Sequence, residues 1–179
     1  NSLVPLYDFL YAYLQKEKSE KMTIYADAFK KCADNIIANG VPHNNWNLLQ
    51  AHFIMNIALI LEDDAKYADG KGRQYYIDYL VNQSSIRQWS LKKLADYGFD
   101  AATGIWAECP GYSSVVVGDY ASFVSLFDEN LGMDLTREIP VLSKAVEAMP
   151  QYLFPNRMVC GFGDTHPSTL RTDIFRYMI

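Results

Sequence analysis

The chain has 179 residues, a formal net charge of −5 and no block of basic residues, so we expect no nucleic-acid partner. Hydrophobic residues make up 50% of the chain and charged residues 21%, a balance typical of a globular domain rather than of a disordered segment. Because no apolar run is long enough to span a bilayer, we expect no membrane partner either.

Apolar residues recur at helical spacing through the first half of the chain. The pattern predicts helices over residues 6–15, 19–39, 46–61, 71–81 and 85–97, with Gly40 and Gly98 as two of the stops. The third of these is apolar nearly all round, which predicts a central, buried helix. Three acidic residues, 62–64, follow it, and since acids are unfavourable at a helix C-terminus we expect a solvated turn there.

The second half continues in the same style. Val115–Val117 taken alone resembles a strand, but residues 118–131 have helical spacing and stop at Gly132. Thr136 is a candidate N-cap for a helix that runs to about residue 153 with Pro140 in its first turn. Ser168 is a candidate cap for a last helix. Short connections force neighbouring helices to be antiparallel, so we expect an all-α fold of antiparallel helix hairpins in a single helical domain over residues 1–179.

Cysteine and histidine are too scattered to suggest a metal site. Three cysteines and three histidines are present, without zinc-ligand spacing, and we expect no metal and no cofactor. The chain has no initiator Met and no signal peptide, and it stops inside a periodic segment. We therefore expect it to be a piece of a longer protein.

The segment Gly104–Tyr112 is the strongest candidate for a functional loop. It carries Trp106, Glu108 and Tyr112 on a backbone with two glycines and one proline, which predicts a shaped loop between helices. Tyr112 would act as a general base if its pKa were lowered by cationic or donor neighbours. Alternatively, Trp106 and Tyr112 fill the seam between two helices and Glu108 is a surface acid.

A second polar loop, residues 43–47, opens the buried third helix. Asn44 or Asn45 would be placed at a helix N-terminus, where an amide can bind a carboxylate and reduce the effect of its charge. The simpler interpretation is that one of them is only an N-cap.

Two further combinations of side chains are weaker. Asp164 and His166 suggest part of a serine triad, but no GxSxG elbow occurs, and a turn with an exposed His is the simpler interpretation. Glu108 with Asp164 would suit a glycosidase, although the sequence does not fix the separation of the two carboxyl groups.

Several segments, taken in order, resemble the heparinase II/III-like family of polysaccharide lyases. Asn44-Asn45-Trp46-Asn47 is similar to that family's NNWN segment, and Gly104–Tyr112 is similar to its DG-x-(Y/W)-x-E-G-P-G-Y loop. Leu131–Leu135 and Gly161–Asp164 resemble two later turns. The resemblance covers most of the chain from about residue 40 onward.

The resemblance implies a fold and a reaction. The fold would be an incomplete (α/α) toroid, followed in complete members by a C-terminal β-sandwich domain that this chain lacks. The reaction would be β-elimination on an acidic, uronate-containing polysaccharide in the periplasm or outside the cell. Asn44 or Asn45 would hold the uronate carboxylate, and Tyr112 would remove the C5 proton.

The resemblance also assigns the remaining site residues and shows where this chain departs from the pattern. Trp46 and Trp106 would form apolar walls of the sugar cleft, and Glu108 would support the loop. Thr103 stands in place of the usual Asp, and Cys109 in place of a Gly. A non-catalytic carbohydrate-binding helical domain and an α/α-toroid glycoside hydrolase remain as alternatives.

Overall fold

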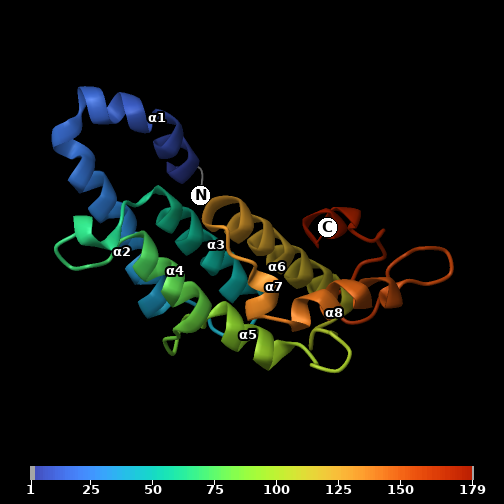
Figure 1. The fold of residues 1–179 in the computed structure, drawn as a ribbon. Coiled ribbons are helices and arrows are strands. Elements are labelled where there is room, and N and C mark those ends of the chain that lie inside the picture. Colours follow the sequence, from blue (N-terminus) through green and yellow to red (C-terminus); the bar gives the residue numbers. More distant parts are fainter. Residues whose placement is uncertain (1–2, 179) are drawn as a thin grey trace. The chain divides into compact units, whose positions relative to one another are not determined.

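The computed structural model describes residues 3–178, and its ribbon is shown in Figure 1. Helices account for 66% of the structure and no strand is formed within the described residues, which confirms the all-α class. Contacts between residues group the chain into two compact units. The first contains the residues up to Pro42 and Leu49–Leu91, and the second contains His43–Leu48 and the residues from Lys92 onward.

The first unit begins with two helices that pack through aromatic rings. Helix α1 (Leu3–Glu17) leads through the 3₁₀ turn η1 (Ser19–Lys21) into α2 (Met22–Asn39), close to the predicted positions. Tyr7 of α1 is buried, and its ring meets those of Tyr25 and Phe29 of α2 edge-on at 6.0 and 5.1 Å between centroids. Edge-to-face pairs of this kind add to the burial of apolar surface, so Tyr7 fixes α1 on α2.

Helix α3 (Asn45–Ile60) is shared between the two units, since its first turn belongs to the second unit and the rest to the first. Ile54, Met55 and Ala58 have no exposed surface, as predicted for a central helix. The prediction was too broad at the N-terminal end of the helix, where Trp46 and Leu49 are 56% and 42% exposed.

The acidic turn after α3 is more than a solvated turn, which corrects the prediction. One carboxylate oxygen of Asp64 accepts hydrogen bonds from the backbone amides of Gly72 and Tyr75, at 2.9 and 3.0 Å. These amides lie at the start of α4 (Arg73–Asn82), where helix amides lack partners within the helix. Asp64, which opens the 3₁₀ turn η2 (Asp64–Lys66), therefore caps α4 from a distance in sequence.

Helix α5 (Leu91–Gly98) begins later than the predicted residue 85. The hydroxyl of Ser85 accepts hydrogen bonds from the amides of Arg87 and Gln88, and that of Ser84 accepts one from the amide of Ser90. Serine side chains that bind nearby amides offer the backbone an alternative to a helix. The segment before Leu91 is irregular for this reason.

The second unit is built on the 22-residue helix α6 (Pro110–Leu131). Val115–Val117 lie inside it, so the strand interpretation was wrong, and Pro110–Tyr112 form its first turn rather than a loop. Pro110 suits this position because the first amides of a helix have no partner to lose. At the other end, Gly132 has φ +61° in the left-handed region and closes the helix.

The elements after α6 are shorter than predicted. Asp134, not Thr136, caps α7 (Leu135–Glu138), with its carboxylate accepting from the Thr136 amide at 3.0 Å. Pro140 then separates α7 from α8 (Val141–Ala148), because proline cannot donate the hydrogen bond that would continue α7. Helix α8 passes into the 3₁₀ turn η3 (Met149–Tyr152).

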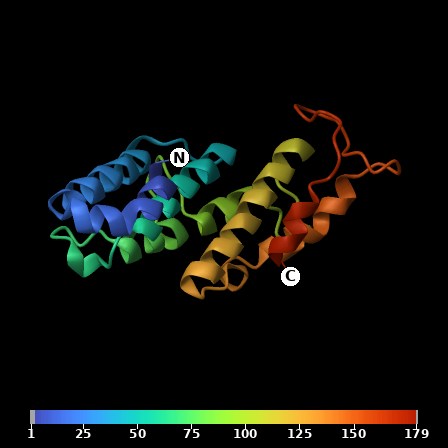
Figure 2. The same ribbon diagram turned by 90° about the horizontal axis from the view of Figure 1, so that it is seen from above.

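The chain returns to α6 through its last element. This is the 3₁₀ helix η4 (Thr172–Met178), and Ser168 does not cap it, since the Ser168 carbonyl accepts from the Val159 amide in an extended pairing. Both η4 and α8 lie along α6, as Figures 1 and 2 show.

Candidate functional site

The loop between α5 and α6 is organised around Trp106. Its indole is only 3% exposed, meets the Phe99 ring at 5.0 Å, and donates from Nε1 to Glu108 Oε2 at 2.7 Å. A Cβ on Gly98 would lie 1.9 Å from the Trp106 ring, so the indole needs a glycine at this point. The buried ring cannot offer a face to a sugar, and the carboxylate of Glu108 is held within the loop.

A tight turn precedes Trp106. The Asp100 carboxylate accepts from the Thr103 hydroxyl at 2.7 Å and from the Thr103 amide at 2.8 Å, and these two bonds lower the pKa of Asp100. Gly104 follows with φ +75°, and a Cβ there would lie 2.4 Å from the Lys144 carbonyl carbon of α8. Thr103, a departure from the lyase pattern, is thus used to build this turn.

The start of α6 is covered by the turn at residues 163–165. The Gly111 amide donates to Thr165 Oγ1 at 2.7 Å, and Gly163, with φ +59°, lies against Cys109. Burial raises the pKa of the Cys109 thiol. Hydrogen bonds from the Thr165 hydroxyl and from backbone amides outweigh burial, and the net pKa is lowered. The later polar turn therefore fixes the first residues of α6.

Tyr112 projects from this fixed first turn. It is 37% exposed, and its hydroxyl has no hydrogen-bond partner within residues 3–178. Helical spacing places Val115 and Asp119 on the same face of α6 as Tyr112. Asp119 lies about 10 Å from Tyr112 along the helix axis. The face thus carries a phenol and a carboxyl group.

Asp119 is a titratable residue that the sequence reasoning missed. Its pKa is raised from 3.8 to about 6 by burial, against the opposing charge of Arg171. The Arg171 guanidinium reaches the same part of α6, since a Cβ on Gly118 would lie 2.9 Å from its Nη1. The signal was the seven-residue spacing from Tyr112, which becomes visible only once 110–131 is recognised as one helix.

The two asparagines at the start of α3 have different surroundings. Asn44 Oδ1 accepts from the Trp46 amide at 3.0 Å, so Asn44 is an N-cap. Asn45 is half-buried, and its side-chain amide makes no hydrogen bond to any described residue. Trp46 is more than half exposed. Asn45 and Trp46 can therefore contact a ligand, whereas Asn44 already has a structural role.

All six predicted site residues belong to the second unit. The start of α3 meets the end of α5 there, through the rings of His43 and Tyr97 at 5.9 Å. Trp106 packs on Gly98, the residue after Tyr97, and Tyr112 follows in the first turn of α6. No hydrogen bond or ring contact among the described residues joins Asn45 to Tyr112.

Among the described residues, no hydrogen bond or ion pair joins Asp164 to His166 or Glu108 to Asp164. Asp164 and His166 are exposed in the 163–166 turn, and Glu108 is engaged by Trp106. Residues 3–178 contain no group of three His, Cys, Asp or Glu side chains arranged to hold a metal ion.

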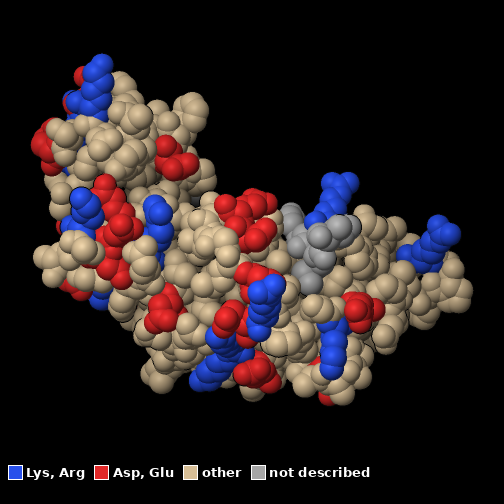
Figure 3. Space-filling view, in the orientation of Figure 1, with Lys and Arg blue, Asp and Glu red and all other residues tan. Residues whose placement is uncertain are grey.

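The distribution of surface charge and the apolar character of the helices are relevant to possible partners. On the face shown in Figure 3, Lys and Arg lie in small separate groups, several of them beside Asp or Glu. None of the helices in the described range has the length and apolar character needed to cross a bilayer.

A family model for the second domain of endo-acting ulvan lyases matches residues 102–179. The matched segment lies within the second unit and contains Trp106, Glu108 and Tyr112. The match supports a polysaccharide lyase family in general rather than the heparinase II/III-like one in particular. No curated protein and no solved structure matched the chain.

Proposed function

We propose that this chain is part of a lyase that cuts a uronate-containing polysaccharide of the ulvan type, within the polymer, by β-elimination. The supporting observation is Tyr112 in the matched segment, a phenol that is 37% exposed and has no hydrogen-bond partner among residues 3–178. It stands on the first turn of the long helix α6, whose positive end attracts anionic groups. Asn45, whose side-chain amide makes no hydrogen bond to any residue that the structure describes, lies in the same unit.

The proposed reaction divides the work between these two groups. The Asn45 amide donates to the uronate carboxylate and stabilises the charge that builds up there when the C5 proton leaves. Ionised Tyr112 removes that proton, and the C4–O bond breaks as the C4–C5 double bond forms. The leaving glycosidic oxygen takes a proton, from the Tyr112 hydroxyl in the simplest scheme.

The two tryptophans take different parts in this proposal. Trp46 is exposed and provides a flat face on which a sugar ring can stack. Trp106 is buried, so we assign it a positioning role. Its bond to Glu108 holds the loop that leads directly into the first turn of α6. This replaces the sequence-based interpretation of Trp106 as a cleft wall.

The larger setting is part of the proposal. We assign the helix hairpins to an incomplete (α/α) toroid that works with a C-terminal β-sandwich domain, in the periplasm or outside the cell. The all-α fold class and the lyase match to residues 102–179 support the helical part of this assignment, and the location and the β-sandwich domain rest on the family resemblance alone.

The test is ultraviolet absorbance of the unsaturated uronyl product, measured with the complete natural protein that contains this chain. Ulvan and other uronate polymers serve as substrates. We expect absorbance to rise, and Tyr112→Phe to lower kcat by about 10²–10⁴-fold, as for loss of a general base or acid. Tyr13→Phe, an exposed tyrosine of the first unit, is the matched control and keeps full activity.

Two other results would point elsewhere. New reducing ends without absorbance would indicate a hydrolase. Binding of the polymer with neither product would indicate a non-catalytic carbohydrate-binding domain. Full activity in Tyr112→Phe would remove Tyr112 from the mechanism even if the protein is a lyase.

A further inference from the structure

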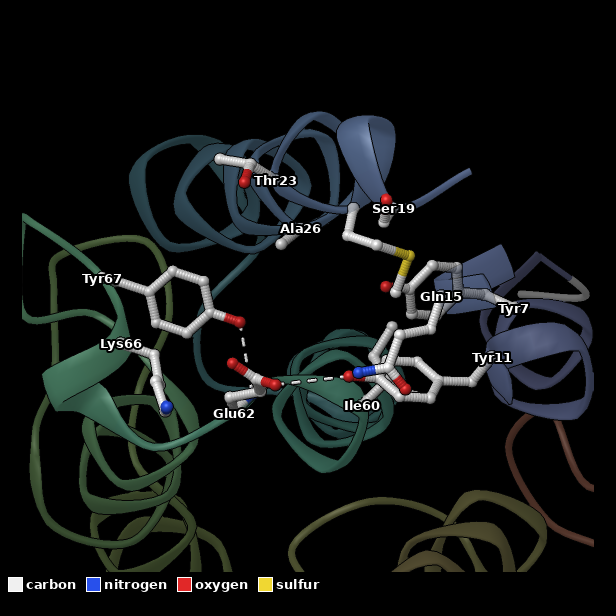
Figure 4. Close-up of a pocket in the computed structure, with 11 residues that line it drawn as sticks. Tyr7, Tyr11, Gln15, Ser19, Thr23, Ala26, Ile60, Glu62, Lys66 and Tyr67 are labelled. Carbon is white, nitrogen blue, oxygen red and sulfur yellow. Dashed lines mark hydrogen bonds between the residues drawn. The ribbon is translucent and has the colours of Figure 1, made fainter. Parts of the chain in front are cut away.

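A polar pocket of about 280 Å³ lies entirely within the first unit (Figure 4). Its walls come from one face of α1, from the start of α2 and from the turn after α3. The volume is slightly below the roughly 300–1,000 Å³ of ordinary small-molecule sites, so it suits one small ring rather than a large cofactor. None of its lining residues takes part in the proposed lyase reaction.

The hydrogen bonds already made in the pocket leave a defined set of groups for a ligand. Tyr11 donates its hydroxyl proton to Glu62 Oε1 at 3.3 Å, so its oxygen can still accept. The Tyr67 hydroxyl accepts from the Glu62 amide at 3.2 Å, so its own proton can still be donated. The second carboxylate oxygen of Glu62 accepts no hydrogen bond from the described residues.

These groups point toward one space. In Figure 4 the hydroxyls of Tyr11 and Tyr67 approach Glu62 from opposite sides, and Thr23 faces it across the opening. Donors and acceptors therefore alternate around the pocket. A ligand that carries several hydroxyl groups, each of which both donates and accepts, matches this arrangement.

Two of the pocket tyrosines, Tyr7 and Tyr11, are held as neutral groups. Burial raises the pKa of Tyr7 to about 12, and burial together with the Glu62 charge raises the pKa of Tyr11. Both phenols stay protonated at neutral pH, so they act as hydrogen-bond donors and apolar ring surfaces rather than as bases. Glu62 is the one carboxylate in the pocket lining, whereas glycoside hydrolysis needs two. The pocket is thus equipped for binding and not for cleavage.

Charge selects the kind of ligand. Glu62 and Lys66 contribute one negative and one positive charge to the pocket wall. Two nearby lysines are already paired, Lys30 with Asp69 at 2.7 Å and Lys71 with Asp34 at 3.1 Å. The wall is therefore close to neutral, and its central acceptor is an anion that would repel an acidic sugar.

We propose that this pocket is a binding site for one neutral pyranose unit, separate from the lyase site. The hydroxyls of the sugar donate to Glu62 and accept from Tyr67, and its ring packs on the tyrosine walls. Binding does not depend on the elimination reaction. It would let the protein hold a neutral part of a polysaccharide while a different part reacts.

The experiment is saturation-transfer NMR on the intact chain. The neutral probes are methyl glycosides of glucose, galactose, mannose and xylose at millimolar concentration. Methyl glucuronide and methyl glucosaminide supply the same ring with a negative and a positive charge. We expect signal from at least one neutral glycoside, and a weaker signal from each charged ring than from the glucoside.

Variants locate the binding. Glu62→Gln should weaken it about fivefold, because a hydrogen bond to a charged acceptor becomes one to a neutral acceptor. Tyr67→Phe should weaken it by a similar factor. Glu17→Gln and Tyr13→Phe, on the same unit but outside the pocket, are matched controls without effect. Tyr112→Phe should also bind normally, which separates this pocket from the lyase site.

Three results would overturn the proposal. They are absence of signal from every neutral glycoside, preference for the glucuronide or the glucosaminide, and unchanged binding in both pocket variants. Circular dichroism of each variant checks that the helices are intact.

Discussion

Asn44 and Asn45 are adjacent amides with separate assignments, one to stability and one to substrate. Asn44 satisfies an amide at the start of α3, and Asn45 has no bond within the described chain. Asn44→Ala should lower the free energy of unfolding by about 1 kcal/mol, the usual value for an N-cap. Urea unfolding measures this loss.

Asn45→Ala should show the opposite pattern. It should leave stability within about 0.5 kcal/mol of the parent protein, because no hydrogen bond to a described residue is lost. If Asn45 holds the uronate, kcat/KM for elimination should fall about 10²-fold or more, as when a donor to a developing negative charge is removed. A fall of the same size in Asn44→Ala alone would reverse the two assignments.

The partly buried carboxyl group of Asp119 should make stability depend on pH. Its pKa in the folded chain, about 6, is above the ordinary 3.8, so the folded state holds the proton more tightly than the unfolded state. The contribution of this group to stability is therefore complete below about pH 4 and lost as the pH rises to about 6.

Asp119→Asn should flatten this part of the stability curve, measured by urea unfolding at several pH values. Asp128→Asn removes an exposed acid from the same helix and serves as the control. A curve for Asp119→Asn that keeps the full slope would show that another group is responsible.

Single residues were predicted unevenly from the sequence. Side-chain chemistry placed Tyr112 and the pair Asn44–Asn45 among the candidates, and the resemblance to a lyase family gave them their proposed roles. Neither was enough for Trp106, because its burial depends on a close approach to Gly98 and on Glu108 turning back to the indole. A tryptophan on a Gly- and Pro-rich segment looks the same in sequence whether its ring faces solvent or the core.

At the scale of elements, two glycines with left-handed backbones differ in what surrounds them. Gly132 at the end of α6 has open space where a Cβ would be, whereas a Cβ on Gly104 would meet the α8 backbone. Gly132→Ala should cost about 1 kcal/mol, from backbone conformation alone. Gly104→Ala should cost about 3 kcal/mol, since overpacking adds to the same backbone cost.

Chemical denaturation of the two variants isolates the packing contribution as their difference. Equal losses would mean that the loop moves away from α8 without cost. In that case the fixed position of Trp106, two residues later, would need another explanation.

Helices with a regular apolar period were predicted well, and their ends less so. The positions of α1, α2 and α4 followed from periodicity, with ends that differ from the predicted ones by up to three residues. The late start of α5 depends on serine hydroxyls that bind amides, and the cap of α4 comes from Asp64 in the preceding turn. Hydrogen bonds from side chains to backbone amides do not recur at a fixed spacing in the sequence. The pattern of apolar residues therefore does not predict them.

At the scale of the whole molecule, the segment that matches the family model and the second compact unit begin and end at different residues. The match covers residues 102–179, but the second unit also uses His43–Leu48 and the chain from Lys92. A fragment of residues 102–179 would lack Leu94 and Leu48, both fully buried. It should therefore show poorly dispersed NMR signals and no cooperative thermal transition. The chain of residues 1–179 should show well-dispersed signals and a cooperative transition.

A fragment of 102–179 that unfolds cooperatively would contradict this prediction. It would show that α6, α8 and η4 are sufficient for a stable core without α5 or the first turn of α3.

Because α3 gives its first turn to one unit and the remainder to the other, no single cut in the chain separates the two units. Recombination that exchanged the first unit for a foreign module would have to preserve the six residues His43–Leu48 of the second unit inside it. We therefore expect the two units to change in sequence together during evolution. A second unit inherited as one contiguous stretch would lack Asn45, the amide proposed to bind the substrate.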